Sequence, residues 1–365
     1  MAQDIPTLIS VNLFKKPDVI FYVVRPFQET YFKSTLSFLP DLSKVLIVRA
    51  KKKGNADGSW DQLPSGVYYH WINPVSLKFL KTKVFVTPET AKNYRGLPRA
   101  TYRVHIPHSP VSLHMIYPQN SFMGFNVIFA AGQHHINEFK AMHNDLVKVF
   151  EVGYGRLDYL KSFNQQTCDS NNVVKATVVI APSWHKGNFL EVIGLDLILI
   201  LLELNYRVVL RPHYKIAELT PNLLTGFNLI ADENKNLIID IAGADCTVMF
   251  NSDLMISDYS GVAYEYAMVT DKPVLFVNSK PKVRNENWRD IGLEPMEIES
   301  RSVFGLVASV DPVDITDKIA DLLSSNQSGE KGRPLRDRDF YFFNANGKVA
   351  PVMSRSICEL VEECK

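Results

Sequence analysis

Polar residues at positions 256–267 (ISDYSGVAYEYA) lie between an apolar run and a stretch rich in alanine and tyrosine that has a helical composition. A helix that begins at Ser260 and Gly261 would offer unpaired backbone N–H groups and a partial positive charge to an anion. Ser260 adds a hydroxyl, Gly261 lets the backbone approach a phosphate closely, and Glu265 could accept hydrogen bonds from ribose hydroxyls. The segment therefore predicts a nucleotide-diphosphate site, with an ordinary helix N-cap as the alternative.

A second segment, residues 208–214 (VVLRPHY), delivers Arg211 and His213 to the end of an apolar, β-branched run. The planar donors of arginine can bind two phosphate oxygens at once. His213 could hydrogen-bond a phosphate or protonate a leaving group. The alternative is a surface arginine beside a structural histidine.

The third segment, residues 102–110 (YRVHIPHSP), places His105 and His108 at or just after the end of another apolar run. A histidine there could remove a proton from an acceptor hydroxyl, because its unperturbed pKa of about 6.5 is close to neutral pH. His134 and His135 follow the next apolar run. Their spacing matches no standard zinc pattern, so we predict no metal site.

Several common enzyme classes are disfavoured by what the sequence does not contain. There is no GxxxxGK[ST] motif, no GxGxxG after the first apolar run and no GxSxG. A P-loop NTPase, an ordinary NAD-dependent dehydrogenase and an α/β-hydrolase are therefore poor interpretations.

Composition favours a globular protein of two domains. The chain has 365 residues, of which 46% are hydrophobic and 22% charged, and its 40 Lys and Arg nearly balance its 39 Asp and Glu. This balance argues against a uniformly basic, nucleic-acid-coating surface. The four cysteines form no metal-ligand pattern, which favours reduced thiols in a cytoplasmic protein. The start of the chain does not read as a signal peptide, and the most apolar stretch, residues 190–204, reads as a buried helix.

Short β-branched runs alternate with helical patterns along the chain, which is typical of parallel α/β architecture. We expect strands in the first half at 18–24, 44–48, 83–87, 102–106, 126–130 and 147–152. In the second half we expect strands at 177–181, 207–210, 228–231, 253–257 and 273–277, with helices at 190–204, 237–242 and 262–268. A polar stretch at 164–172 (NQQTCDSNN) reads as a linker. The predicted domains are residues 1–163 and 173–340, followed by a helical segment at 341–365.

Taken in order, these segments resemble the CDP-glycerol glycerophosphotransferases of teichoic-acid and capsule polymer synthesis. The family has a His-Gly-Thr-Pro element, a Gly-x-Pro-Arg-x-Asp-x-Leu element, Ala-Pro-Thr-Trp, Arg-x-His, Thr-Asp-Tyr-Ser-Ser-Val-x-x-Asp-x-Ala and a closing Asp-Gly-Lys-type turn. The counterparts in this sequence are His108-Ser109-Pro110, residues 153–160 (GYGRLDYL), Ala181-Pro182-Ser183-Trp184, Arg211-Pro212-His213, residues 257–267 and Asn346-Gly347-Lys348. The histidine element is one residue shorter here, Gly155 replaces the proline, Gly261 the second serine and Glu265 the aspartate.

The resemblance implies an α/β protein of GT-B fold, with two Rossmann-like domains whose parallel sheets face each other across a cleft. It implies a transferase that moves glycerol phosphate, or a similar alditol phosphate, from a CDP-linked donor to a hydroxyl of a bacterial surface polymer. The donor's nucleotide would bind the second domain, and the acceptor would approach from the first. No metal or other cofactor is implied.

The same resemblance distributes roles among the residues. His108 would be the base, with His105 as a competitor for that role and His134 also on the acceptor side. The residues that would bind the donor are Arg211, His213, Ser183, Ser260, Gly261 and Glu265. His213 is also a catalytic candidate. The expected partners are CDP-glycerol or another nucleotide-linked donor and a polymer or lipid-linked glycan, not nucleic acid.

Three other functions stay open at this point. One is a GT-B glycosyltransferase that uses a nucleotide sugar, since its diphosphate needs the same residues. Another is a non-catalytic scaffold on this fold, and the last is a nonhydrolysing nucleotide-sugar epimerase. We expect a cytoplasmic protein that contacts the inner membrane peripherally, through the basic run at 51–53 and the nearby Trp60.

Overall fold

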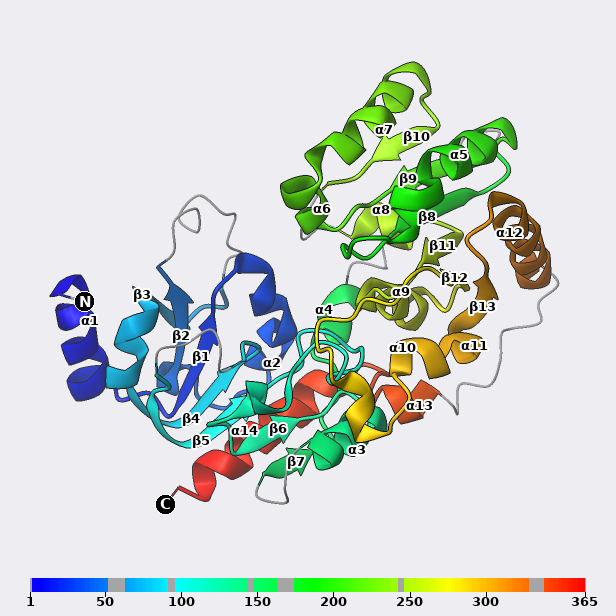
Figure 1. The fold of residues 1–365 in the computed structure, drawn as a ribbon. Coiled ribbons are helices and arrows are strands. Elements are labelled where there is room, and N and C mark those ends of the chain that lie inside the picture. Colours follow the sequence, from blue (N-terminus) through cyan, green and yellow to red (C-terminus); the bar gives the residue numbers. More distant parts are fainter. Residues whose placement is uncertain are drawn as a thin grey trace. The chain divides into compact units, whose positions relative to one another are not determined.

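The computed structural model describes residues 2–51, 63–90, 96–142, 147–162, 174–241, 246–327 and 338–364. The chain divides into two compact units (Figure 1). Unit 1 comprises Met1–Tyr159 and Asp339–Lys365, and unit 2 comprises Leu160–Arg338. The stretch predicted as a linker, 164–172, lies outside the described residues, and the predicted domain limits stay predictions.

Unit 1 is built on a seven-stranded parallel sheet with the order β3-β2-β1-β4-β5-β6-β7. Strands β1 and β2 are buried along their whole length, as expected for a parallel sheet covered on both faces. The strands are β1 (Val19–Val23), β2 (Val45–Ala50), β3 (Tyr68–Ile72), β4 (Lys81–Thr87), β5 (Arg99–His105), β6 (Val127–Phe129) and β7 (Lys148–Phe150).

The helices of unit 1 are mostly short. At the N-terminus are the 3-10 helix η1 (Ala2–Asp4), α1 (Ile5–Ile9) and the π-helix η2 (Ser10–Lys15). The others are η3 (Pro26–Tyr31), α2 (Lys33–Leu36), η4 (Leu42–Lys44), η5 (Pro74–Phe79), η7 (Gln119–Phe122), α3 (Gln133–Met142), α4 (Arg156–Lys161), at which the unit ends, α13 (Arg338–Tyr341) and α14 (Val349–Glu362).

The C-terminal segment returns to unit 1, where α14 packs beside α2 (Figure 1). Close backbone contacts at glycines allow this return. A Cβ at Gly132 would lie 2.2 Å from the Tyr341 carbonyl oxygen, and one at Gly153 would lie 2.2 Å from that of Phe343. Asp158 then accepts a hydrogen bond from the Ala350 backbone N–H at 2.8 Å. The GYGRLDYL element at 153–160 therefore has a structural role in this chain.

Unit 2 contains a six-stranded parallel sheet with the order β10-β9-β8-β11-β12-β13. Its strands are β8 (Thr177–Ala181), β9 (Arg207–Leu210), β10 (Leu237–Ile239), β11 (Leu254–Ser257), β12 (Val274–Val277) and β13 (Gly305–Ala308). Its helices are α5 (Phe189–Glu203), α6 (Tyr214–Leu219), α7 (Pro221–Glu233), α8 (Thr247–Phe250), α9 (Gly261–Thr270), η8 (Trp288–Ile291), α10 (Met296–Glu299), α11 (Arg301–Phe304) and α12 (Pro312–Gln327).

Two predicted elements of unit 2 are wrong. The expected strand at 228–231 is part of helix α7, and the expected helix at 237–242 begins with strand β10. Apolar runs this short suit either a buried strand or a helix face, and here Pro221 at the first position of α7 starts a helix that runs through to Glu233. Strands β3 and β13 were not predicted.

The fold class is as predicted: two α/β units, each with a parallel Rossmann-like sheet. In both sheets the strand order reverses once, between β1 and β4 in unit 1 and between β8 and β11 in unit 2. Ligands of open α/β sheets bind outside the carboxyl ends of the strands at such switch points. Among the described residues, no helix is long and apolar enough to cross a membrane.

Candidate active site

Residues predicted for the donor follow neighbouring strands of unit 2 at one edge of its sheet. Ser183 comes after β8, Arg211 directly after β9, and Ser260 after β11. Strands β8 and β11 flank the switch point, and β9 is the neighbour of β8. Parallel strands end at the same edge, so the sheet brings these three positions, far apart in the sequence, to one side of unit 2.

Asp258 ties the strand ends of this edge together. Its carboxylate accepts the Ser183 backbone N–H at 2.8 Å and the Ser279 hydroxyl at 3.3 Å, from the ends of β8 and β12. The Asp258 side chain is fully buried. A buried carboxylate with these bonds fixes the loops around the switch point.

The Ser183 hydroxyl belongs to a second connection across the same edge. It lies 2.7 Å from His185 Nδ1, and His185 Nε2 lies 2.5 Å from the Lys280 carbonyl oxygen. Ser183 is 1% exposed, and its hydroxyl is engaged by His185. Its observed role is to join the β8 and β12 loops.

The Arg211 side chain has two partners, a carboxylate and a thiol sulfur. Its guanidinium forms an ion pair with Asp240, at the end of β10, and Nη2 lies 3.7 Å from the Cys246 sulfur. The Arg211 side chain is about one-tenth exposed. A guanidinium has five N–H donors in a fixed plane, more than these two contacts use, so phosphate oxygens can still be bound.

The start of α9 has the geometry that the sequence predicted. Ser260 is the N-cap, in an extended conformation, and its side chain makes no capping bond to the helix. Gly261 is the first helical residue, and α9 runs for ten residues. Glu265 lies one turn into the helix and is 7% exposed.

A cationic and aromatic group surrounds Trp184, after β8. The Lys215 ammonium lies 4.0 Å from the centre of the indole, Arg284 lies 5.7 Å away, and the His213 ring centre is 6.2 Å from it. His213 Nδ1 accepts the Lys215 backbone N–H at 3.2 Å and so caps α6. Nearby, Lys282 donates to the Tyr259 carbonyl, and burial lowers the pKa of its ammonium. These cations add positive charge to the edge where a diphosphate would bind.

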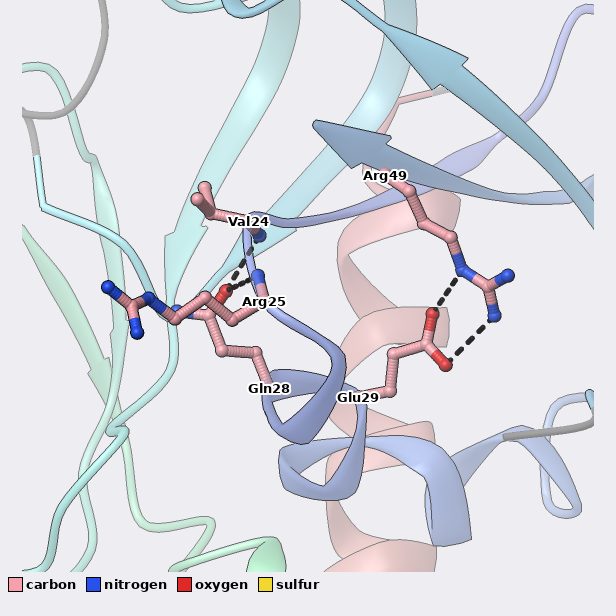
Figure 2. Close-up of polar contacts among 5 residues, drawn as sticks. All are labelled: Val24, Arg25, Gln28, Glu29 and Arg49. Atoms are coloured by element: carbon pink, nitrogen blue, oxygen red, sulfur yellow. Dashed lines mark hydrogen bonds and ion pairs between the residues drawn. The ribbon is translucent and has the colours of Figure 1, made fainter. Parts of the chain in front are cut away.

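In unit 1 a glutamine side chain connects the two loops at the switch point (Figure 2). Gln28 Oε1 accepts the backbone N–H groups of Val24 and Arg25 at 2.7 and 3.0 Å, at the end of β1. Gln28 Nε2 donates to Glu89 after β4 at 2.5 Å. These bonds fix the first loop of unit 1, with the exposed Arg25 on it.

A buried ion pair holds η3, the helix that follows this loop (Figure 2). Glu29 and Arg49 are bonded twice, at 2.7 and 3.1 Å, and both side chains are almost fully buried. The Arg49 guanidinium also lies 4.5 Å from the Tyr69 ring centre. A bidentate pair of this kind is geometrically specific, and it links β2 to η3.

The histidines predicted for unit 1 have different surroundings. His108 is half-buried, and the Tyr117 hydroxyl lies 2.8 Å from its Nε2 and 3.1 Å from its Nδ1. His105 is buried against Phe122 and Phe125, and burial lowers its pKa to about 3. A histidine neutral at pH 7 can be a base, but a buried one cannot meet an acceptor directly, which favours His108 over His105.

His134 is also buried. Its Nε2 lies 2.8 Å from the Pro110 carbonyl oxygen, and burial lowers its pKa to about 3. It therefore contacts the segment that follows His108, and its place on the acceptor side stays a prediction. No group of His, Cys, Asp or Glu within the described parts of the chain could hold a metal ion.

Sequence reasoning missed several polar residues at these edges: Asp240, Asp258, Lys282, Gln28, Glu89 and Tyr117. Asp258 directly follows β11 and is the aspartate of the Thr-Asp-Tyr-Ser element, so it had a signal, whereas Asp240 follows β10, a strand that the sequence did not predict. Tyr117 and Lys282 had none, because their partners are brought near only by the fold.

Two Rossmann-like units with polar residues at the carboxyl edges of their parallel sheets define a protein of the GT-B class. Within that class, the family model of the CDP-glycerol:poly(glycerophosphate) glycerophosphotransferases matches residues 121–358, and the chain belongs to this family of transferases. A search of curated proteins found no significant match.

Solved structures of similar fold share little sequence with this chain. The UDP-GlcNAc 2-epimerase of Methanocaldococcus jannaschii, in complex with UDP-GlcNAc and UDP, matches with a TM-score of 0.59 and 13% identity over 93% of this chain and 99% of that one. A glycosyltransferase of Rickettsia africae gives 0.56 and 13% over 96% and 99%. A UDP-N-acetylglucosamine 2-epimerase of Rickettsia bellii gives 0.60 and 11% over 95% and 96%. These likenesses show the GT-B fold.

Proposed function

We propose that the protein transfers glycerol phosphate, or a similar alditol phosphate, from a CDP-linked donor to a hydroxyl of a bacterial surface polymer such as teichoic acid or capsule. The acceptor oxygen attacks the phosphorus that bears the glycerol. The bond from that phosphorus to the CMP phosphate oxygen breaks, CMP departs, and the product is a phosphodiester. The proton of the acceptor hydroxyl passes to a base.

The observation that carries this proposal is the set of residues at the carboxyl edge of unit 2, inside the region of the family match. Ser260 and Gly261 lie at the start of α9, and Arg211 lies directly after β9. These positions are beside or next to the switch point, where a diphosphate is expected in such sheets. Lys282 and the start of α9 add fixed positive charge there. Fixed donors stabilise charge that develops on the phosphates without reorganising during the reaction.

We assign roles as follows. His108 takes the proton of the acceptor hydroxyl. Arg211, Ser260 and the backbone at Gly261 hold the diphosphate, and His213 hydrogen-bonds the departing phosphate oxygen. Glu265 holds the ribose, and Ser183 supports the nucleotide loop through its bonds to Asp258 and His185.

We also propose that unit 1 contacts an anionic membrane surface at the cytoplasmic face, where a lipid-linked acceptor would be presented. The basic run at 51–53 and Trp60 fall almost wholly outside the described residues, so support comes from the N-terminal helices. Leu13 and Phe14 on η2 are 61% and 79% exposed. Exposed apolar side chains beside lysines are typical of interfacial helices.

The donor is tested by calorimetric binding of CDP, CMP, UDP and GDP, followed by mass analysis after incubation with CDP-glycerol and acceptor fragments. We expect selective binding of cytidine nucleotides and an added glycerol-phosphate mass on the acceptor. Preference for UDP or GDP with a sugar-sized increment would instead identify a glycosyltransferase. Conversion of a nucleotide sugar without any acceptor would identify an epimerase.

The variants His108→Ala and His213→Ala distinguish an enzyme from a non-catalytic scaffold. Both should still bind CDP with an affinity within a few-fold of the wild type, while turnover falls by about 10² or more, as expected for the loss of an acid–base group. A wild-type protein that binds CDP but never turns over any donor would favour the scaffold.

A further inference from the structure

The segment that carries His108 is fastened to helix α3 by side chains that the proposed reaction does not use. His134 Nε2 lies 2.8 Å from the Pro110 carbonyl oxygen, and His135 Nε2 lies 3.0 Å from that of Val111. Both rings donate to the chain within three residues of His108. They are 6% and 2% exposed, so water does not compete for these bonds.

Glu138, one turn further along α3, extends the same attachment. Its carboxylate accepts the Leu113 backbone N–H at 2.5 Å and lies 3.3 Å from His114 Nδ1. Burial alone would raise the pKa of Glu138, but the hydrogen bond to His114 and the neighbouring histidines lower it overall. We name His134, His135 and Glu138 the α3 clamp. The clamp fixes the backbone of residues 110–114 at three points.

The His108 side chain has its own partner in Tyr117. The hydroxyl is within hydrogen-bond distance of both ring nitrogens, and the rings meet edge to face with centres 5.7 Å apart. Phe122 packs edge to face on Tyr117, at 5.4 Å, and restricts its rotation. The hydroxyl of Tyr154 adds a 3.4 Å contact to the His108 carbonyl oxygen.

We propose that Tyr117 is a positioning residue that fixes the orientation of the His108 ring, and that the α3 clamp holds the backbone from which His108 projects. This inference rests on the proposed role of His108 as base. It also gives His134 a function other than contact with the acceptor.

The chemistry needs a partner of this kind. In a neutral imidazole one nitrogen carries the proton and the other accepts. The Tyr117 hydroxyl is close enough to both nitrogens to bond either tautomer, either donating to the unprotonated nitrogen or accepting from the protonated one. After proton transfer both nitrogens are donors, and the same phenol oxygen still accepts one of them. The ring therefore keeps its orientation through the reaction.

The first test is Tyr117→Phe, with Tyr102→Phe as the matched control. Tyr102 lies on β5 in the same unit, but its hydroxyl bonds Glu363. We expect Tyr117→Phe to lower kcat about five- to tenfold, the effect of one hydrogen bond, with the KM for CDP-glycerol unchanged. The control should leave both constants unchanged. A rise in KM with constant kcat, or equal effects of the two substitutions, would overturn the role of Tyr117.

The second test does not depend on turnover. Long-range proton–nitrogen NMR spectra of ¹⁵N-histidine protein report on the surroundings and motion of each imidazole ring, and His108→Gln assigns the signal. We expect one sharp His108 side-chain signal in the wild type and in Tyr102→Phe, and a signal broadened by exchange between ring orientations in Tyr117→Phe. An unchanged His108 signal in Tyr117→Phe rejects the inference. Full turnover by His108→Gln would instead reject the proposed base and leave the NMR result standing.

The clamp is tested with His134→Leu and His134→Gln. Glutamine keeps an N–H that can reach the Pro110 carbonyl, whereas leucine does not. We expect His134→Leu to disturb the His108 signal and to lower kcat, and His134→Gln to restore much of both. Circular dichroism shows whether each variant is folded, and His70→Leu on β3 controls for loss of a partly buried histidine. If the leucine variant is folded and the His108 signal is unchanged, the clamp does not position His108.

Discussion

Arg211 enters the proposed reaction already paired with a carboxylate. A guanidinium that is only about one-tenth exposed would be costly to bury without a partner, and Asp240 supplies one. The pair also fixes the plane of the guanidinium, so that donors not used by Asp240 keep a constant direction. Arginine suits this position better than lysine, because its planar guanidinium can donate to Asp240 and still present further donors to a phosphate in a fixed direction.

Arg211→Lys is therefore expected to weaken CDP binding about tenfold although the positive charge is kept. Isothermal titration calorimetry measures the effect, and Arg207→Lys is the control, since Arg207 begins the same strand at the opposite edge of the sheet. Equal affinities for wild type and Arg211→Lys would show that Arg211 is a structural partner of Asp240 and not a phosphate ligand.

At this scale the sequence identifies a residue well when its signal is local. Ser183, Arg211 and Ser260 each directly follow or lie just beyond an apolar strand, so their place at the sheet edge could be predicted from their own neighbours. Tyr117 could not, because its relation to His108 depends on how the connection after β5 folds back. The burial of His105 and His134 was equally hidden, since it depends on aromatic neighbours from η7 and beyond.

Among the elements, the GYGRLDYL segment connects family resemblance with packing. Gly153 has a φ of +105°. The Tyr31 carbonyl lies so close to Gly155 that a Cβ there would be 2.0 Å from the carbonyl oxygen. Arg156 donates to Thr30 on η3 at 2.7 Å. These contacts attach the returning C-terminal segment and η3 to the rest of unit 1, which explains why small residues are needed there.

Gly153→Ala is expected to lower the free energy of unfolding by about 3 kcal/mol or more, because the new Cβ meets the Phe343 carbonyl and the backbone is left-handed. Gly347→Ala separates the two causes. Gly347 has a φ of +85° with nothing within 4 Å, so only about 1 kcal/mol of backbone strain is expected. Urea denaturation of both variants measures the difference, and equal losses would show that the close contact costs nothing.

Element types were predictable where apolar runs were bounded by turn residues, as at β8, β9 and α9. They were not predictable at 228–231 and 237–242, where short runs of leucine and isoleucine fit a strand or a helix equally well. There the choice is made by neighbours: α7 packs against α5, and β10 pairs with β9. The hydrophobic periodicity of the sequence alone predicts neither of these two contacts.

For the whole molecule, buried histidines make stability depend on pH. Burial lowers the pKa of His105 and of His134 to about 3, below the roughly 6.5 of the unfolded chain. The unfolded state then binds more protons below pH 6.5, so stability is complete above that pH and falls as the pH drops towards 3. As the pH falls below 6.5, each buried histidine lowers the free energy of unfolding by about 1.4 kcal/mol per pH unit.

Unit 1 should therefore lose about 3 kcal/mol between pH 6.5 and pH 5 from these two groups together. Hydrogen exchange of the β4 and β5 amides follows unit 1 alone, and His134→Gln should reduce the slope by about half. Exchange that is independent of pH, after correction for the intrinsic rate, would contradict the buried neutral state of both rings.

The N-terminal surface makes the last prediction. Leu13 and Phe14 are exposed beside Lys15 and Lys16, and Asn12 pins this helix to the chain through bonds to the Phe79 carbonyl and the Lys81 N–H. Phe79 is itself 46% exposed. An apolar surface with a lysine rim gains both hydrophobic burial and attraction to anionic lipid, and the attraction is weakened by salt.

The protein should therefore sediment with phosphatidylglycerol vesicles at low salt, more weakly at high salt, and least with phosphatidylcholine vesicles. Leu13→Ser should weaken the partitioning about tenfold, since burying one leucine side chain is worth about 1.5–3 kcal/mol. Leu229→Ser is the matched control, because Leu229 is 63% exposed on α7 in unit 2. Equal losses from both substitutions would indicate non-specific adhesion, and no binding by the wild type would reject the membrane contact while leaving the proposed transfer reaction untouched.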